Sequence, residues 1–132
     1  MKKTKSRSKK SLLKKAHKLC WKACYEAIKR RDKVCQVHGK ECKGKTLVAD
    51  HCISRVHANT FFDERNLTLV CNGVNWGKFK GNKFLIAEIE AIVDKKFGEG
   101  TVDELRSQAR LTRKYTITDL ENLTALYEGM YK

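Results

Sequence analysis

Four residues of this chain have the chemistry needed to cleave a phosphodiester bond. Asp50 and His51 are adjacent, and two asparagines follow at Asn66 and Asn75. Phosphodiester hydrolysis needs a base that takes a proton from the attacking water and a cation that neutralises charge on the phosphate. Histidine titrates near neutral pH, and carboxylate and amide oxygens suit a hard cation. The pattern predicts His51 as general base, with Asp50 and Asn75 binding Mg²⁺ or Mn²⁺.

The surrounding residues predict the elements that would position these four side chains. The segments 46–48 and 67–70 are short runs of apolar, β-prone residues, which is typical of strands. A helical pattern follows Cys71. A strand ending in Asp-His, a loop, a strand after Asn66 and a helix carrying Asn75 resemble the ββα-metal fold of HNH nucleases. The resemblance implies that Asn66 holds the loop that orients His51. The competing interpretation is that a lone Asp-His or Asn is a turn or capping residue.

The positive charge of the chain is concentrated at its start. The formal net charge is +14 over 132 residues, and residues 1–34 hold fourteen Lys and Arg against two acidic residues, a net +12. Such a run binds phosphates and steers a protein onto a polyanion, although a solvated tail is the alternative. We expect a basic flexible arm over residues 1–10 and a basic amphipathic helix over residues 11–32. DNA is the expected partner, through Lys14, Lys18, Lys22, Arg30, Arg31, Arg55, Lys78 and Lys80.

The cysteines are predicted to be thiols or metal ligands rather than disulfides. The sequence has no apolar stretch typical of a signal peptide or a membrane span, so we expect no membrane association and a reducing, cytoplasmic location. Residues 33–45 resemble a zinc knuckle, with Cys35, His38 and Cys42 as ligand-type residues. Cys20 and Cys24 share a face of the first helix with His17, and we expect them to pack.

A structural Zn²⁺ is the second predicted metal. HNH proteins of this kind often carry two Cys-x-x-Cys pairs that hold zinc beneath the active site. Here the second pair is Cys71-Asn72-Gly73-Val74, and valine cannot bind zinc. We infer that Cys42 supplies the missing ligand, giving a site at Cys35, His38, Cys42 and Cys71. The alternative is that zinc has been lost and these side chains only pack.

Helical patterns dominate the end of the chain, residues 83–132. Apolar spacing predicts a helix over residues 83–97 that stops at Gly98. Thr101 to Glu104 and Thr118 to Glu121 fit the capping-box pattern and predict two further helices. Trp76, in the helix after Cys71, is expected in the core, with base stacking as the alternative.

Four segments together resemble the NinG (Rap) recombination nucleases of lambdoid phages. They are residues 25–32, the string Phe62-Asp63-Glu64-Arg65-Asn66, residues 71–82, and the tail around residues 98–105 and 115–118, within a match that spans roughly residues 12–130. The resemblance implies a phage-encoded endonuclease that cuts Holliday junctions and other branched DNA in the cytoplasm of a bacterial host.

The expected architecture is a single α+β domain over residues 11–132. Its zinc-knuckle-like loop and ββα-metal core occupy residues 33–82, between the basic N-terminal helix and the C-terminal helices. Two other functions stay open: a nicking or homing-type HNH endonuclease on duplex DNA, and a non-catalytic, zinc-bearing DNA-binding module. A homodimer is a hypothesis, because cutting a junction requires two strand scissions.

Overall fold

The structure, a computed structural model, describes residues 3–132 and side chains from residue 8 onward. Its elements are α1 (Lys3–Asp32), β1 (Leu47–His51), α2 (Ala58–Phe61), the 3₁₀-helix η1 (Glu64–Asn66), β2 (Leu67–Cys71), α3 (Asn72–Phe79), α4 (Lys83–Phe97), α5 (Thr101–Ala109) and α6 (Ile117–Gly129). The α+β class is therefore confirmed.

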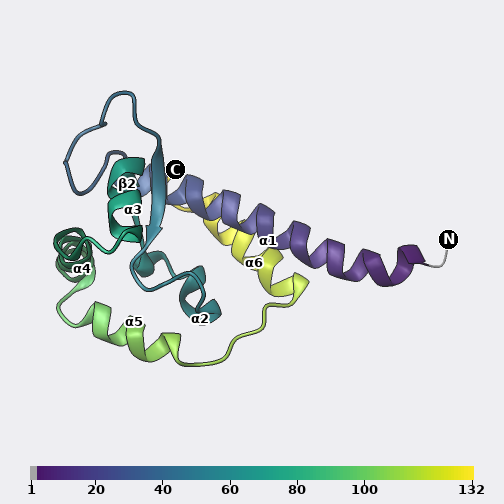
Figure 1. Cartoon of the computed structure of the whole chain (residues 1–132). Coiled ribbons are helices and arrows are strands. Elements are labelled where there is room, and N and C mark those ends of the chain that lie inside the picture. Colours follow the sequence, from purple (N-terminus) through teal and green to yellow (C-terminus); the bar gives the residue numbers. More distant parts are fainter. Residues whose placement is uncertain (1–2) are drawn as a thin grey trace.

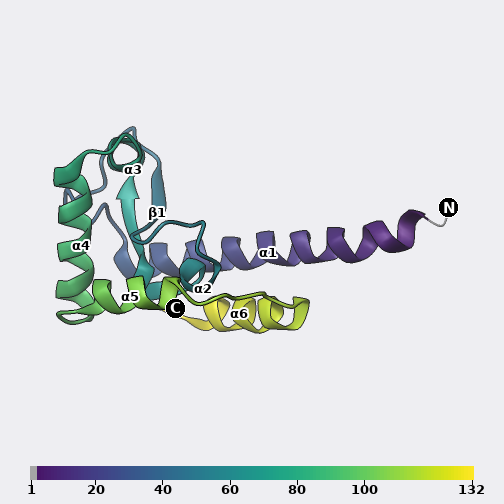
Figure 2. The same ribbon diagram turned by 60° about the horizontal axis from the view of Figure 1, so that its bottom comes forward.

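Helix α1 is the longest element and its N-terminal half extends beyond the rest of the protein (Figures 1 and 2). Its 30 residues span about 45 Å at 1.5 Å per residue. The helix begins at Lys3 rather than at Ser11 as predicted, so residues 3–10 continue it instead of forming a separate arm. The reason is that this stretch contains no Gly or Pro and is rich in Lys, a good helix former. Residues 1 and 2 lie outside the described residues.

The main core lies where α1 and α6 run side by side against the sheet. Helix α1 contributes a stripe of small and apolar side chains that includes Cys20, Cys24 and Ile28, all fully buried. They pack with Leu120 of α6 and Leu69 of β2. Full burial of a side chain such as Ile28 contributes roughly 1.5–3 kcal/mol to the free energy of folding. The two cysteines of α1 therefore act as packing residues, as the sequence predicted.

Strands β1 and β2 form an antiparallel hairpin whose β2 is buried on both faces. Successive side chains of a strand point to opposite faces. Leu67 and Leu69 accordingly pack in the core with α1, whereas Val70 packs in a second core with Ile89 of α4. In the register of the pair, Asp50 lies opposite Thr68 and His51 opposite Leu67. The pairing therefore fixes the Asp-His pair at the end of β1 against β2, the strand that is buried on both faces.

Helices α3 and α4 pack closely at a glycine. A Cβ added at Gly77 would lie 2.6 Å from Leu85 Cδ1 of α4, so a larger residue would displace the Leu85 side chain. The chain reverses between the two helices at Gly81, whose φ of 86° suits glycine. Asn82 then caps α4, its side-chain oxygen accepting from the amides of Phe84 and Leu85. The predicted helix over residues 83–97 is confirmed.

The last two helices form where expected but begin differently. Gly100, in the left-handed region, precedes α5, and the Thr101 hydroxyl donates to the Gly98 carbonyl instead of capping the helix. Helix α6 begins with a capping box of Thr116 and Asp119, two residues before the predicted one. Both predicted capping boxes are therefore wrong, because the pattern recurs by chance among Thr, Asp and Glu and the true start depends on where the chain enters the helix.

Candidate functional site

His51, the last residue of β1, lies in an aromatic enclosure. Its ring stacks on Trp21 of α1, with centroids 5.1 Å apart and an interplanar angle of 16°. Phe61 of α2 packs against it at a centroid distance of 4.6 Å. The enclosure therefore brings together three elements that are distant in the sequence and leaves the imidazole a defined orientation.

The hydrogen bond of His51 determines which ring nitrogen can accept a proton. Nε2 lies 3.1 Å from the carbonyl oxygen of Phe61, and a carbonyl can only accept, so Nε2 carries the hydrogen. In the neutral ring, Nδ1 is then the free acceptor. Burial, together with the charges of Lys78 and Arg55, lowers the pKa of His51 to about 4, although the hydrogen bond to the Phe61 carbonyl acts in the opposite direction. The imidazole is consequently neutral at physiological pH, the state that a general base requires.

Asn66 holds the loop that connects the two strands. Its side chain is fully buried at the end of η1, directly before β2. The side-chain oxygen accepts from the Ile53 amide at 2.6 Å, and the side-chain amide donates to the carbonyls of Ile53 and Thr60 at 3.0 and 3.1 Å. These bonds fix both ends of the segment that follows His51. Asn66 is therefore a positioning residue that acts through the backbone of the loop.

Asp50 is buried and paired with a lysine that the sequence did not predict as its partner. Only 5% of Asp50 is exposed. Lys78 of α3 places its ammonium 2.7 Å from Asp50 Oδ2 and 2.5 Å from the carbonyl oxygen of His51. Burial raises the pKa of the Asp50 carboxyl above its ordinary value, while the charge and hydrogen bond of Lys78 act in the opposite direction. The carboxylate of Asp50 and the carbonyl oxygen of His51 thus both contact the Lys78 ammonium.

Asn75 lies on the side of α3 that carries Lys78. Residues three apart on a helix share a face, and α3 contacts β1. Asn75 is half-buried on this helix. The structure therefore places Asp50, His51 and Asn66 around the end of the hairpin, with Asn75 on the adjacent helix.

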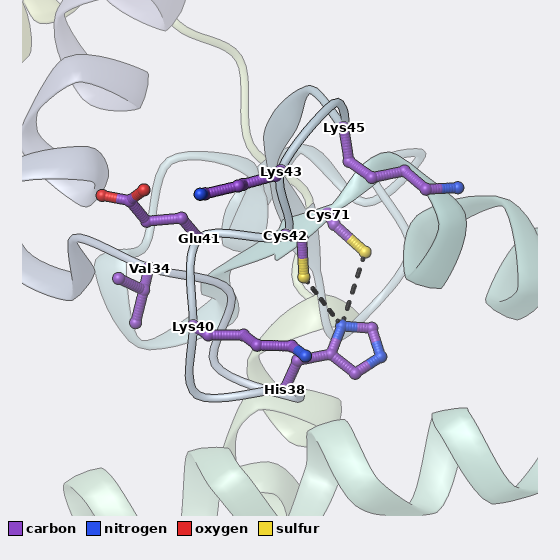
Figure 3. A pocket seen from close by; sticks show the side chains of 8 residues that line it. All are labelled: Val34, His38, Lys40, Glu41, Cys42, Lys43, Lys45 and Cys71. Atoms are coloured by element: carbon purple, nitrogen blue, oxygen red, sulfur yellow. Dashed lines mark hydrogen bonds between the residues drawn. The ribbon is translucent and has the colours of Figure 1, made fainter.

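The four predicted zinc ligands lie together at the opposite end of the hairpin, where Cys71 pairs with Leu47. Cys35, His38 and Cys42 come from the loop after α1, and Cys71 from the junction of β2 and α3. Their ligand atoms all lie within 4.8 Å of one another. Figure 3 shows the thiols of Cys42 and Cys71 directed at the imidazole of His38, with Sγ to Nδ1 distances of 3.0 and 3.7 Å. Ligand separations of about 3.5–3.8 Å follow from tetrahedral zinc with bonds of about 2.0–2.3 Å. The cluster can bind a metal ion such as zinc.

The local backbone explains how Cys42 enters the cluster in place of residue 74. The loop reverses twice, with Gly39 and Cys42 both at positive φ, 69° and 56°, and the Cys35 amide donates to the Lys40 carbonyl. This fold-back brings Cys42 to Cys35 across seven positions of sequence. Val74, on the first turn of α3, is instead 97% buried in the second core, where it packs as an apolar residue.

Cys71 has the electrostatic setting of a metal ligand at the start of a helix. Burial acts to raise the pKa of its thiol, but the amide of Val74 and the neighbouring thiols of Cys42 and Cys35 outweigh burial and lower this pKa below its ordinary value. The thiolate is the form that binds metals. Burial and hydrogen bonding to Cys71 together raise the pKa of Cys42 to about 11. The thiolate form is therefore favoured at Cys71 over Cys42.

The predicted DNA contacts divide into exposed and internal residues. Lys14, Lys18 and Lys22 are exposed and four residues apart, so they form a stripe along one face of α1. Arg55 and Lys80 are also exposed. These five side chains are free to meet phosphates.

Two arginines predicted as DNA contacts are engaged inside the protein. The side chain of Arg31 is 7% exposed and binds Asp32, Glu64 and the Leu67 carbonyl. Arg30 donates to two carbonyls at the end of α6. The side chain of Arg31 is therefore not available to DNA as predicted, whereas the DNA contact of the half-buried Arg30 stays a prediction. A helix-end Arg-Arg-Asp run gives no sign of which residues it will meet across the core.

Three features of the site were missed from the sequence. Lys78 was predicted to contact the DNA backbone and instead binds Asp50. Trp21 was not identified as a neighbour of His51. Trp76 was expected in the core, but it is 56% exposed. Helical spacing gave a signal for Lys78 alone, since it follows Asn75 by three residues.

Comparison of the chain with protein-family models, with curated proteins and with solved structures found no match. Among the described residues, no helix is both long enough and apolar enough to cross a membrane.

Proposed function

We propose that this protein is a divalent-metal-dependent endonuclease of the HNH, ββα-metal type. The observation that carries the proposal is the end of β1, where a neutral His51 with a free Nδ1 lies beside a buried Asp50 whose oxygen faces a cation. Asn66 supports it by fixing the loop between the strands. A base and an anionic oxygen set side by side on a rigid hairpin suit hydrolysis of a phosphodiester.

The reaction follows from the tautomer of His51. Nδ1 accepts a proton from a water as the water oxygen forms a bond to phosphorus, and the bond from phosphorus to the leaving sugar oxygen breaks. Nε2–H continues to donate to the Phe61 carbonyl oxygen, which stabilises the imidazolium that forms. Stacking on Trp21 keeps the ring in place during the transfer.

The residues around Asp50 fit a hard divalent cation. Three oxygens, Asp50 Oδ2 and the carbonyls of His51 and Cys52, lie within 3.5 Å of the Lys78 ammonium, so the site already accommodates positive charge. Asp50 and Asn75 would hold Mg²⁺ or Mn²⁺, with oxygen ligands that both ions prefer. Such an ion would neutralise charge on the phosphate and on the leaving oxygen. Lys78 would leave Asp50 when the ion binds.

Zinc bound by Cys35, His38, Cys42 and Cys71 would have a structural role. The four ligands connect the loop after α1 to the start of α3, the helix that carries Asn75. A bound Zn²⁺ would therefore hold α3 against the hairpin. The closed set of four protein ligands leaves no position for substrate, as in structural zinc sites.

Branched DNA is the proposed substrate, on the basis of the resemblance to the NinG recombination nucleases. The exposed lysine stripe of α1 supports a polyanionic partner, because Lys14, Lys18 and Lys22 face solvent together. A protein of this kind would act in phage recombination within the bacterial cytoplasm. A homodimer would supply the two cuts that a junction needs.

The decisive experiment incubates purified protein with a four-way junction and with linear duplex of the same sequence, with and without Mg²⁺ or Mn²⁺. We expect cutting only with a cation and preferentially of the junction. His51→Ala should reduce cutting by at least about 100-fold, the usual scale for a general base, while junction binding in EDTA persists. His57→Ala is the matched control, since His57 is exposed in the same loop.

The alternatives correspond to distinct outcomes of this assay. Equal cutting of junction and duplex would indicate a nicking or homing-type enzyme. Binding without cutting under every condition would indicate a non-catalytic DNA-binding module. Equal cutting by His51→Ala and by the unmodified protein would overturn the assignment of His51.

A further inference from the structure

An exposed aromatic pair lies on α3, the helix that carries Asn75 and Lys78. Phe79 is 79% exposed and Trp76 is 56% exposed, although large aromatic side chains usually bury most of their surface. Their rings stack on each other, with centroids 5.5 Å apart and an interplanar angle of 18°. The pair therefore presents flat apolar surface to solvent in a fixed orientation.

Positive charge accompanies this surface. The Lys80 ammonium lies 5.3 Å from the centre of the Trp76 ring, a cation–π contact. Residues 72–87 contain three lysines and no acidic residue. We call Trp76, Phe79 and Lys80 the aromatic ridge. A ligand of the aromatic ridge must offer a flat face that stacks on the rings and a negative charge that pairs with Lys80.

Helix geometry places the ridge beside the predicted metal ligand. Each residue turns an α-helix by about 100°, so Phe79 lies about 40° from Asn75 and Trp76 about 100° from it, on the side away from Lys78. Lys78 points to Asp50. Phe79 therefore lies about 100° and Trp76 about 160° from Lys78 around the helix, so a strand bound at Asp50 and His51 would reach the ridge by passing over Asn75 and Phe79.

We propose that the aromatic ridge binds unpaired nucleotides of a DNA strand by base stacking on Phe79 and Trp76, with Lys80 at the backbone. This inference rests on the proposed nuclease function for its biological role, because branch points expose unpaired bases. Stacking on aromatic side chains combined with a cation is the chemistry that recognises single strands without sequence preference. Paired bases in a duplex offer no free face to these rings.

The test measures binding of fluorescently labelled oligo(dT) and of a blunt hairpin duplex by anisotropy in EDTA, so cutting plays no part. We expect Trp76→Ala and Phe79→Ala each to weaken oligo(dT) binding by about fivefold or more, with duplex affinity changed less than twofold. Leu126→Ala is the matched control, because Leu126 is 58% exposed on α6. Thermal melting of each variant verifies folding.

Salt dependence separates the two kinds of contact in the ridge. Lys80→Gln should lower the slope of log affinity against log salt for oligo(dT) by about 0.7, the value for one phosphate contact on a single strand. The aromatic variants should leave that slope unchanged.

Three results would overturn the ridge proposal. One is unchanged oligo(dT) affinity in both folded aromatic variants, and another is equal loss for oligo(dT) and duplex. The third is a change from dimer to monomer in sedimentation with oligo(dT) binding intact, which would assign the ridge to a second copy of the chain. Absence of cutting in the junction assay would overturn the nuclease function alone, because oligo(dT) binding is measured without it.

Discussion

Lys78 and Asp50 form the ion pair at the centre of the candidate active site, with Nζ 2.7 Å from Oδ2. Their side chains are 15% and 5% exposed, so both charges are largely withdrawn from water. A cation and the lysine cannot both occupy the carboxylate edge that faces α3. The pair therefore makes Lys78 an internal competitor of any divalent ion bound by Asp50.

Replacing the lysine should tighten metal binding. Lys78→Met removes the competitor and leaves a buried carboxylate unpaired, so we expect Mn²⁺ to bind about tenfold more tightly, in line with the roughly 1.5–3 kcal/mol of a hydrogen bond to a charged group. Isothermal titration calorimetry measures the affinity. Lys80→Met, on the same helix but exposed, is the control. Equal Mn²⁺ affinity in both variants and the unmodified protein would contradict competition.

Asn66 should contribute to stability as well as to activity. Asn66→Ala leaves the Ile53 amide and carbonyl without these partners, and each such buried group costs about 1–3 kcal/mol; the Thr60 carbonyl keeps its bond from the Asp63 amide. We expect the free energy of unfolding to fall by at least about 2 kcal/mol in urea denaturation. Asn72→Ala, at an exposed position, should change it by less than about 0.5 kcal/mol. A small effect of Asn66→Ala would refute the role of Asn66 in holding the loop.

The ion pairs of Asp32 should make the stability of the fold depend on pH in acid. Burial acts to raise the pKa of this carboxyl, but hydrogen bonds from Arg31, Lys96 and the Leu69 amide outweigh burial and lower the pKa below its ordinary value. Its stabilising contribution is therefore complete above the unfolded-state pKa of about 3.9 and is lost as pH falls through the lower folded-state value.

Substitution isolates this contribution. Asp32→Asn removes the only carboxylate of the described residues that pairs with the Lys96 ammonium and one of the two that pair with Arg31, and it should cost about 3 kcal/mol at pH 7. Urea unfolding between pH 7 and pH 2 should then show a shallower loss of stability in acid than the unmodified protein. Asp103→Asn, whose side chain is 85% exposed, should cost at most about 1 kcal/mol. Parallel pH profiles for Asp32→Asn and the unmodified protein would rule out this linkage.

Loss of a ligand from the Cys35, His38, Cys42 and Cys71 cluster should release zinc and lower the stability of the fold. We expect one zinc per chain by atomic emission spectroscopy, and loss of zinc together with a lower melting temperature in Cys35→Ser, because the metal stabilises only the folded ligand set. Cys52→Ser is the control cysteine outside the cluster. Zinc content that is equal in the two variants, or absent from the unmodified protein, would contradict the zinc assignment.

Local sequence patterns were enough to predict most of the secondary structure. Apolar spacing predicted α4 between Asn82 and Gly98, and β-prone runs predicted both strands, because these periods reflect side-chain directions within one element. The four ligand-type residues of the cluster were predicted correctly as a group, since cysteine and histidine at short spacing are uncommon by chance. The starts of α1, α5 and α6 were predicted less well, because capping patterns recur at several positions.

The sequence by itself determined the chemical inventory: a carboxylate and an imidazole at the end of a strand, two asparagines, a ligand set and a basic first helix. Only the tertiary structure decided how these groups are used. It paired Lys78 with Asp50, stacked Trp21 on His51, turned Arg31 inward and left Trp76 exposed. The physical reason is range: hydrogen bonding and periodicity within an element are encoded locally, whereas the partner of a long charged or aromatic side chain depends on how distant elements pack.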